Sequence, residues 1–373
     1  MLNDKSLILF FTTGMSLEKW ARFGNLSREV ELYNKLAESF KNIYFVTYGS
    51  REKETNYRYL LADNITILHK RITFLPDKIY TLLIPFLYAD FLGRVDYIKT
   101  NQMPGSLSAL IAKLIFKKQL IIRCGYEFLK NNISRKVNFL KIACIRLYEK
   151  LVYFYADKII VSSEGDKIFI ISELGIVASK VFVIPNYVNT DVFKPMGISK
   201  DRGRICYVGR LNNNEKNLKN LVMAMSEVPA SLVLIGDGEY GEDLKSLGMK
   251  HKVALKMLGC LPNDQLPLEL NKAEIFVLPS FFEGCPKALL EAMSCGLACI
   301  GTNVDGIKQI IQDGENGLLC ETDALSIRKA MADLLSADDL RSKLGHNARE
   351  TIVNKFSIFT VVSQELDLYH NGG

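Results

Sequence analysis

The 373-residue sequence has little of what builds metal and disulfide sites. It contains four histidines, and its eight cysteines are scattered without a C-x-x-C pair. A zinc site therefore has no ligand spacing to support it. We expect the cysteines to be reduced thiols, most of them in the core.

Long apolar runs are also absent. The opening run Leu7–Phe11 has five residues, whereas a signal sequence needs roughly 7–15 apolar residues and a membrane-spanning helix about 20. The run therefore predicts a buried first strand. The chain is expected to be cytoplasmic and not integral to a membrane.

The composition is that of a globular protein, with 48% hydrophobic and 24% charged residues and no low-complexity tract. Because a domain typically contains roughly 100–200 residues, the length favours two domains. A break in the pattern near 186–203 places the linker there. We expect an N-terminal domain at 1–190 and a C-terminal domain at 191–373.

Apolar strand segments alternate with segments of helical period in both halves of the chain. Strands are predicted at 7–11, 43–48, 65–68, 97–100, 120–123, 158–162 and 181–184, and then at 205–208, 231–235, 254–258, 275–278, 297–300 and 317–319. This alternation predicts the α/β class, with two Rossmann-like, doubly wound domains that face a central cleft. Ligands of such sheets lie at the carboxyl ends of the strands.

The strongest motif follows the predicted strand 275–278 and enters a predicted helix. Gly284 allows the backbone to approach a ligand closely, and the free N–H groups of 285–288 lie at the positive helix end, which suits a diphosphate. Glu283 in the loop and Glu291 inside the helix then flank the ligand, one at the sugar and the other at the ribose. On spacing alone, a dipole partner and a solvated helical glutamate explain the two acids equally well. The ligand-binding residues expected in this segment, at the place of the donor in the family described below, are Gly284, Cys285, Pro286, Lys287, Ala288 and Glu291.

Two further strand ends support a phosphate site. Gly209 and Arg210 follow one predicted strand, with Lys216 six residues after Arg210, and these cations suit a pair of phosphates. Gly236 ends the next strand in another glycine-rich turn. Neither turn has the spacing G-x-G-x-x-G, which disfavours a nicotinamide fold.

Taken in order, these segments resemble a known family. The set VGRL, EKN, LIGDG, LPSFFEGCPKALLEAMSCGL and DGENGLL closely resembles the second domain of retaining GT-B glycosyltransferases of the family-4 type. The resemblance implies sugar transfer from a nucleotide donor with retention of configuration and without a metal. It assigns the diphosphate to Arg210 and Lys216, the donor sugar to Glu283 and the ribose to Glu291. No D-x-D triplet is present.

The first half matches this family less well. A glycine-rich loop with Gly14 and Ser16, followed by Trp20, lies after the first predicted strand and is expected on the acceptor side. Family members often carry a histidine after the strand that here ends at Arg123, but this chain has none there. Arg123 or Glu127 takes that place, the site is built differently, or these two residues form a local ion pair.

Positive charge gathers in residues 101–150, where ten basic residues face two acidic ones, a local charge of +8 compared with +6 for the whole chain. Aromatic residues are interleaved with these cations. Contact of 113–150 with an anionic membrane and an ordinary solvated face explain the pattern equally well. No nucleic-acid module accompanies it, so no nucleic-acid partner is expected.

The sequence thus predicts a metal-independent glycosyltransferase that needs no cofactor. Its partners are a UDP- or GDP-sugar donor and a saccharide or lipid-linked acceptor, in surface polysaccharide or glycolipid assembly. A nucleotide-sugar epimerase or hydrolase of the same fold, or a non-catalytic sugar-nucleotide-binding protein, remains an alternative. The last segment of helical period, 356–369, is expected to cross back to the first domain.

Overall fold

A computed structural model describes residues 2–125, 128–134, 137–212 and 215–370 of the chain. It contains two compact units: unit 1 comprises Met1–Pro185 with Val362–Gly373, and unit 2 comprises Asn186–Val361. The division expected after residue 190 thus falls between Pro185 and Asn186, and the end of the chain belongs to unit 1.

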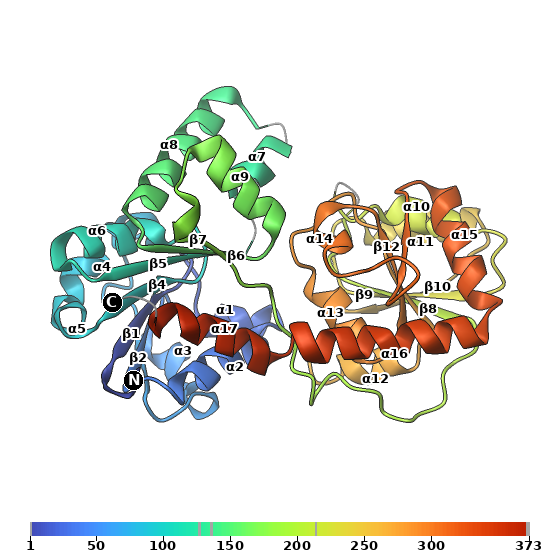
Figure 1. Ribbon diagram of the computed structural model, residues 1–373, viewed down its shortest axis with the longest axis horizontal. Helices are drawn as coiled ribbons and strands as arrows, with labels where there is room; N and C mark the ends of the chain where they lie inside the picture. The colour runs from blue at the N-terminus through green and yellow to red at the C-terminus, as the bar shows by residue number, and fades with distance from the viewer. Residues whose placement is uncertain (1, 126–127, 135–136, 213–214, 371–373) are drawn as a thin grey trace. The chain divides into compact units, whose positions relative to one another are not determined.

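Unit 1 contains a seven-stranded parallel sheet in the order β3-β2-β1-β4-β5-β6-β7 (Figure 1). Its strands are β1 (Ser6–Phe10), β2 (Asn42–Val46), β3 (Ile65–Leu68), β4 (Tyr97–Thr100), β5 (Gln119–Cys124), β6 (Lys158–Val161) and β7 (Val181–Val183). Its helices are α1 (Leu17–Arg22), α2 (Leu26–Ala37), α3 (Arg51–Thr55), α4 (Asp77–Leu87), α5 (Ala89–Arg94), α6 (Ser106–Phe116), α7 (Phe128–Ser134), α8 (Phe139–Tyr155) and α9 (Glu164–Leu174), with the end of α17 (Ile358–His370).

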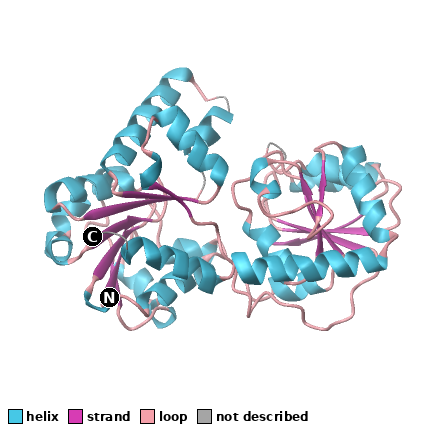
Figure 2. Ribbon diagram, in the orientation of Figure 1, coloured by secondary structure: helices cyan, strands magenta, loops and turns pink. Residues whose placement is uncertain are grey.

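Both faces of this sheet are buried, which explains why its strands are nearly continuous apolar runs. Ile8 and Phe10 of β1 face a core shared with α4, α6, α8 and α9. Leu7 and Leu9, which alternate with them, are fully buried as well and point to the opposite face. Helices therefore cover the strands on both sides, as the magenta strands between cyan helices show in Figure 2.

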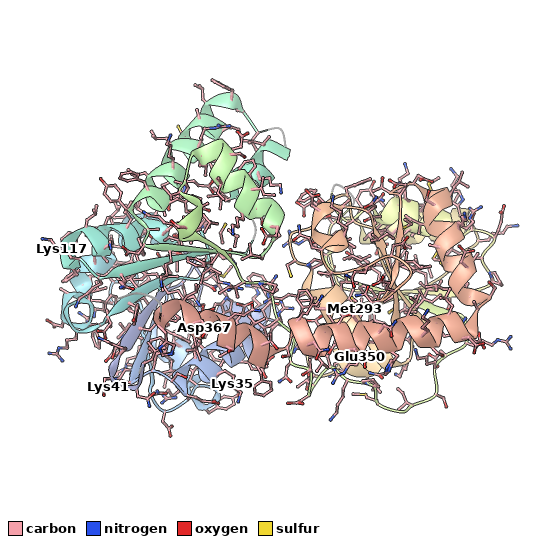
Figure 3. The ribbon with its side chains drawn as sticks, viewed as in Figure 1. Lys35, Lys41, Lys117, Met293, Glu350 and Asp367 are labelled. Atoms are coloured by element: carbon pink, nitrogen blue, oxygen red, sulfur yellow. The ribbon has the colours of Figure 1, made fainter. Side chains whose placement is uncertain are left out.

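Unit 2 contains a six-stranded parallel sheet in the order β10-β9-β8-β11-β12-β13. Its strands are β8 (Arg204–Val208), β9 (Ser231–Ile235), β10 (Ala254–Gly259), β11 (Ile275–Leu278), β12 (Ala298–Thr302) and β13 (Leu318–Cys320). Its helices are α10 (Leu218–Ala224), α11 (Gly241–Lys250), α12 (Leu266–Asn271), α13 (Lys287–Ser294), α14 (Asp305–Lys308), α15 (Ala324–Leu335) and α16 (Asp338–Lys355). A single core runs through the unit and includes Met293 of α13, which Figure 3 labels.

The predicted α/β class with two doubly wound domains is confirmed. Each predicted strand is present with bounds that differ by at most two residues. The predicted C-terminal helix is α17, and six of the eight cysteines are buried, as expected for core thiols.

A buried charge cluster attaches the C-terminal helix to unit 1. Lys99 of β4 and Glu365 of α17 form an ion pair in which both side chains are fully buried. The guanidinium of Arg123, on β5, lies 3.6 Å from the other carboxylate oxygen of Glu365. Burial disfavours ionisation of Glu365, but the two cations outweigh it and hold the pKa of this carboxyl below its ordinary value.

Candidate active site

The strand order of unit 2 creates a natural binding position. β8 pairs with β9 on one side and with β11 on the other, so the connections that follow β8 and β11 leave in opposite directions. Lys216 lies after β8 and Glu283 after β11. The structure brings them together: Lys216 Nζ lies 2.6 Å from Glu283 Oε1, and their side chains are 21% and 11% exposed.

A second hydrogen-bond donor fixes the carboxylate of Glu283. The hydroxyl of Ser280, which is fully buried, donates to Glu283 Oε1 at 2.7 Å. The carbonyl of Ser280 in turn accepts from Thr302 Oγ1 at 2.5 Å. The loops that follow β8 and β11 are also joined directly, because the N–H of Phe281 donates to the carbonyl of Glu215 at 2.9 Å. Glu283 is therefore held by a positive charge and a hydroxyl at the sheet edge.

Helix α13 starts beside this carboxylate. Pro286 occupies its N-cap position, with φ −72° and no side-chain cap, and the first N–H groups of a helix have no partner within the helix. Cys285 and Pro286 are buried, while Lys287 and Ala288 are partly exposed. Glu291 lies further along the helix and is 3% exposed. The positive end of α13 and the Lys216 ammonium thus share one edge of the sheet.

Glycines allow the loops at this edge to pack closely. A Cβ on Gly236 would lie 2.0 Å from the carbonyl oxygen of Gly209, and φ is +139° at Gly236 and +154° at Gly209. A Cβ on Gly306 would lie 2.2 Å from the carbonyl oxygen of Gly284 and 2.3 Å from that of Glu283. Gly209 and Gly236 therefore pack against each other, and Gly306 supports the loop that carries Glu283.

Arg210, the other expected phosphate ligand, is exposed at the end of β8. The phenol of Tyr207 donates to the carbonyl of Arg210 at 3.1 Å and so fixes the turn. Burial raises the pKa of Tyr207 well above its ordinary value, and the negative charge of Glu283 acts in the same direction. The phenol therefore stays neutral and remains a donor.

Sequence reasoning missed three residues that build this site: Ser280, Asn217 and Gly306. Asn217 has φ +54°, a left-handed conformation that asparagine tolerates better than most residues. Its side-chain amide donates to the carbonyls of Pro279 at 2.9 Å and Thr322 at 2.7 Å. The sequence signal that could have identified Asn217 was its position directly after Lys216 at the start of α10, where it orients the chain that carries the lysine.

In unit 1 the glycine-rich loop after β1 also lies at a reversal of strand order, since β1 pairs with both β2 and β4. Gly14 has φ +79°, and its carbonyl accepts from Lys19 Nζ at 2.5 Å. Ser16 caps α1 by accepting from the N–H of Lys19. Trp20 stacks on Phe11 with ring centroids 4.3 Å apart and is 4% exposed, so it packs in the core of this unit.

The structure places Arg123 under α17, where it is 6% exposed and faces Glu365. Its backbone N–H donates to Thr100 Oγ1 at 3.1 Å. Glu127, the other residue expected in place of a histidine, lies outside the described residues. Across the described part of the chain, no cluster of three or more histidine, cysteine, aspartate or glutamate side chains has the arrangement of a metal site.

Comparisons with known proteins show which sequences and folds this chain is similar to. Residues 188–351 match the family model described as glycosyl transferases group 1. The Escherichia coli UDP-Gal:alpha-D-GlcNAc-diphosphoundecaprenol alpha-1,3-galactosyltransferase is 27% identical over 74% of this chain and 75% of its own length. Sucrose-phosphate synthase from Thermosynechococcus elongatus has a TM-score of 0.80 at 18% identity, with 98% of each chain covered. Anabaena HepE in complex with UDP-glucose has a TM-score of 0.77 at 16% identity, with 98% of this chain and 99% of HepE covered.

The two doubly wound sheets have the GT-B fold of these solved structures. The model of the glycosyl transferases group 1 family matches most of unit 2.

Proposed function

We propose that this glycosyltransferase is a retaining, metal-independent enzyme that moves a hexose-type sugar from a UDP- or GDP-sugar to a saccharide or lipid-linked acceptor. The setting that we propose is surface polysaccharide or glycolipid assembly. The observation that carries the proposal is the 2.6 Å pair of Lys216 and Glu283 beside the positive end of α13. The name of the E. coli relative, which specifies a UDP-galactose donor and a diphosphoundecaprenol acceptor, supports these substrate classes.

In this proposal the donor diphosphate binds between Arg210, Lys216 and the start of α13. Fixed positive groups stabilise the charge that develops on the leaving diphosphate, a role that a divalent metal fills in other enzymes. Glu283 holds the Lys216 ammonium in place before the donor arrives and contacts the donor sugar, where its charge stabilises the developing cation. Glu291 takes the ribose, and the backbone at Gly209, Gly236, Gly284 and 285–288 surrounds the nucleotide.

Retention follows if the acceptor hydroxyl attacks from the face that the nucleotide leaves. The bond between the anomeric carbon and the diphosphate oxygen breaks, the bond to the acceptor oxygen forms, and the acceptor proton passes to the diphosphate. No protein nucleophile is required. In unit 1 we propose the Gly14–Ser16 loop for the acceptor, and residues 113–150 for contact with an anionic membrane.

The test begins with a thermal-shift screen of UDP, GDP and ADP, because a ligand that binds only the folded state raises its melting temperature. The corresponding nucleotide sugars are then incubated with and without a saccharide or polyprenyl-diphosphate acceptor, and the product is analysed by NMR for its anomeric configuration. We expect stabilisation by one diphosphate and acceptor-dependent transfer with retention. Three results would each contradict the proposal: epimerisation of the donor, donor hydrolysis that is unchanged when an acceptor is added, or stabilisation by a nucleotide without any turnover.

A further inference from the structure

Helix α8 has an apolar row on the side that faces solvent. Leu140, Leu147, Leu151 and Phe154 are 71%, 71%, 47% and 65% exposed. With Cys144, which is also exposed, they recur at intervals of four and three residues, so they form one stripe along the helix. We call these five residues the α8 row. The helix continues past position 150, where the basic segment expected from the sequence ends.

The opposite side of α8 is already used for folding. Ile145, Val152 and Tyr153 are buried in the core of unit 1. A helix that is apolar on all sides is normally enclosed on all sides, yet α8 is enclosed on one side only. Among monomeric proteins, single exposed apolar residues are ordinary, whereas a continuous stripe marks an interaction surface.

The charged side chains exposed on α8 itself are all positive, and Arg146, which lies away from the row, pairs with Glu173 of α9 at 3.4 Å. Residues 128–155 contain a single acid, Glu149, and its side chain is fully buried. Lys141 and Lys150 are exposed on either side of the row. At the end of neighbouring α6, Leu114 and Ile115 are 53% and 46% exposed, and Lys117 projects outward at the edge of unit 1 (Figure 3).

We propose that α8 is a membrane-docking helix that lies in the surface of an anionic phospholipid bilayer, with the α8 row inserted and the flanking lysines at the headgroups. This combination of an apolar face and flanking cations is what binds a helix in the plane of such a surface. No helix in the described part of the chain combines the length and apolarity needed to cross a bilayer, so the contact is with one leaflet. The proposal deepens the proposed function, since it brings the enzyme to the surface where a lipid-linked acceptor resides.

A second copy of the chain fits this surface less well. Pairing two α8 rows would place Lys141 and Lys150 of one copy against the same residues of the other, with Glu149 of each buried on the inner side. Like charges that face each other disfavour association. Anionic lipid headgroups supply a charge opposite to that of Lys141 and Lys150.

The test is sedimentation of the full chain with vesicles of phosphatidylcholine alone or of phosphatidylcholine with phosphatidylglycerol. We expect binding to the anionic vesicles that weakens as salt is added. A Leu147→Ser, Leu151→Ser variant should bind at least tenfold more weakly. A Lys141→Gln, Lys150→Gln variant should lose roughly fivefold per cation. The matched control is Leu325→Ser, a leucine of α15 in unit 2 that is 73% exposed, which should leave binding unchanged.

Insertion is measured separately with Leu147→Trp and, as control, Leu325→Trp, because the native Trp20 is buried and changes little. Vesicles should shift the emission of the first variant to the blue and leave the second unchanged. No binding at low salt, equal binding by the α8-row variant and the wild type, or concentration-dependent dimers in light scattering that the α8-row variant abolishes would each overturn the proposal. Transfer to a soluble acceptor analogue should be the same in wild type and Leu147→Ser, Leu151→Ser, so a failure of membrane docking is distinguishable from a failure of the enzymatic assignment.

Discussion

Replacing Glu365 by glutamine is expected to loosen the C-terminal helix from unit 1. The Glu365 side chain is fully buried between the side chain of Lys99, also fully buried, and that of Arg123, whose side-chain atoms are 8% exposed. A Glu365→Gln substitution keeps the shape of the side chain but removes the negative charge. Two cations then remain buried without their counter-charge. Removing one partner of a buried ion pair in this way strongly lowers the free energy of unfolding.

The expected loss in the free energy of unfolding is about 3–5 kcal/mol. For a domain of this size each kcal/mol lowers the melting temperature by about 2–4 °C, so the melting temperature of unit 1 should fall by roughly 6–20 °C. Replacing both partners, in Lys99→Met, Glu365→Met, should recover part of the loss because the buried lysine charge is then gone as well.

Calorimetry and urea denaturation measure this loss, with Asp367→Asn as control. Asp367 is an exposed acid on the same helix (Figure 3), and its substitution should change stability by no more than about 0.5 kcal/mol. Because the pKa of Glu365 in the folded protein lies below its ordinary value of 4.5, its contribution is present above pH 4.5 and is lost as the pH falls through the lower, folded value. The difference between wild type and variant should therefore shrink in acid. Equal losses in the free energy of unfolding for Glu365→Gln and Asp367→Asn at pH 7 would refute the reasoning.

Three further predictions concern the donor site. Glu283→Gln should lower kcat for transfer by about 10²–10³ with an unchanged circular-dichroism spectrum, because it weakens the hold on Lys216 and removes the charge at the sugar; turnover within threefold of wild type would argue against this role. Gly306→Ala should reduce transfer because the added Cβ overlaps the carbonyls of 283 and 284, whereas Gly93→Ala, which meets nothing within 4 Å, should be neutral; equal activities would contradict the close packing. Dialysis against EDTA should leave the transfer rate unchanged, and a loss that Mg²⁺ or Mn²⁺ restores would rule out metal independence.

The fold was largely predictable because both sheets are parallel and their central strands are buried on both faces. Strands such as Ile275–Leu278 then appear as short apolar runs between helical segments, and this run matches β11. The donor half was predictable for a related reason. Lys216 and Glu283 each follow a strand at short distance, and neighbouring parallel strands end at one edge.

The charge cluster under α17 could not be predicted in the same way. Glu365 lies 266 positions from Lys99 along the chain, and neither the spacing nor the type of these residues indicates that they meet. Gly306 was missed because its role depends on the carbonyls of a loop from another strand. The acceptor half lacked a motif with a unique chemical interpretation, so Arg123 was only one of several alternatives for the place of the histidine. In the structure its guanidinium faces Glu365.

The most direct test of the donor site is an equilibrium titration with the nucleoside diphosphate that stabilises the enzyme. Wild type, Lys216→Ala and Lys219→Ala are compared at one salt concentration, since Lys219 is an exposed lysine in the first turn of α10. If Lys216 binds the diphosphate, its variant should bind at least tenfold more weakly, which corresponds to about 1.4 kcal/mol, and Lys219→Ala should stay within twofold of wild type. Equal affinities for all three proteins would contradict the placement of the donor diphosphate at the edge between β8 and β11.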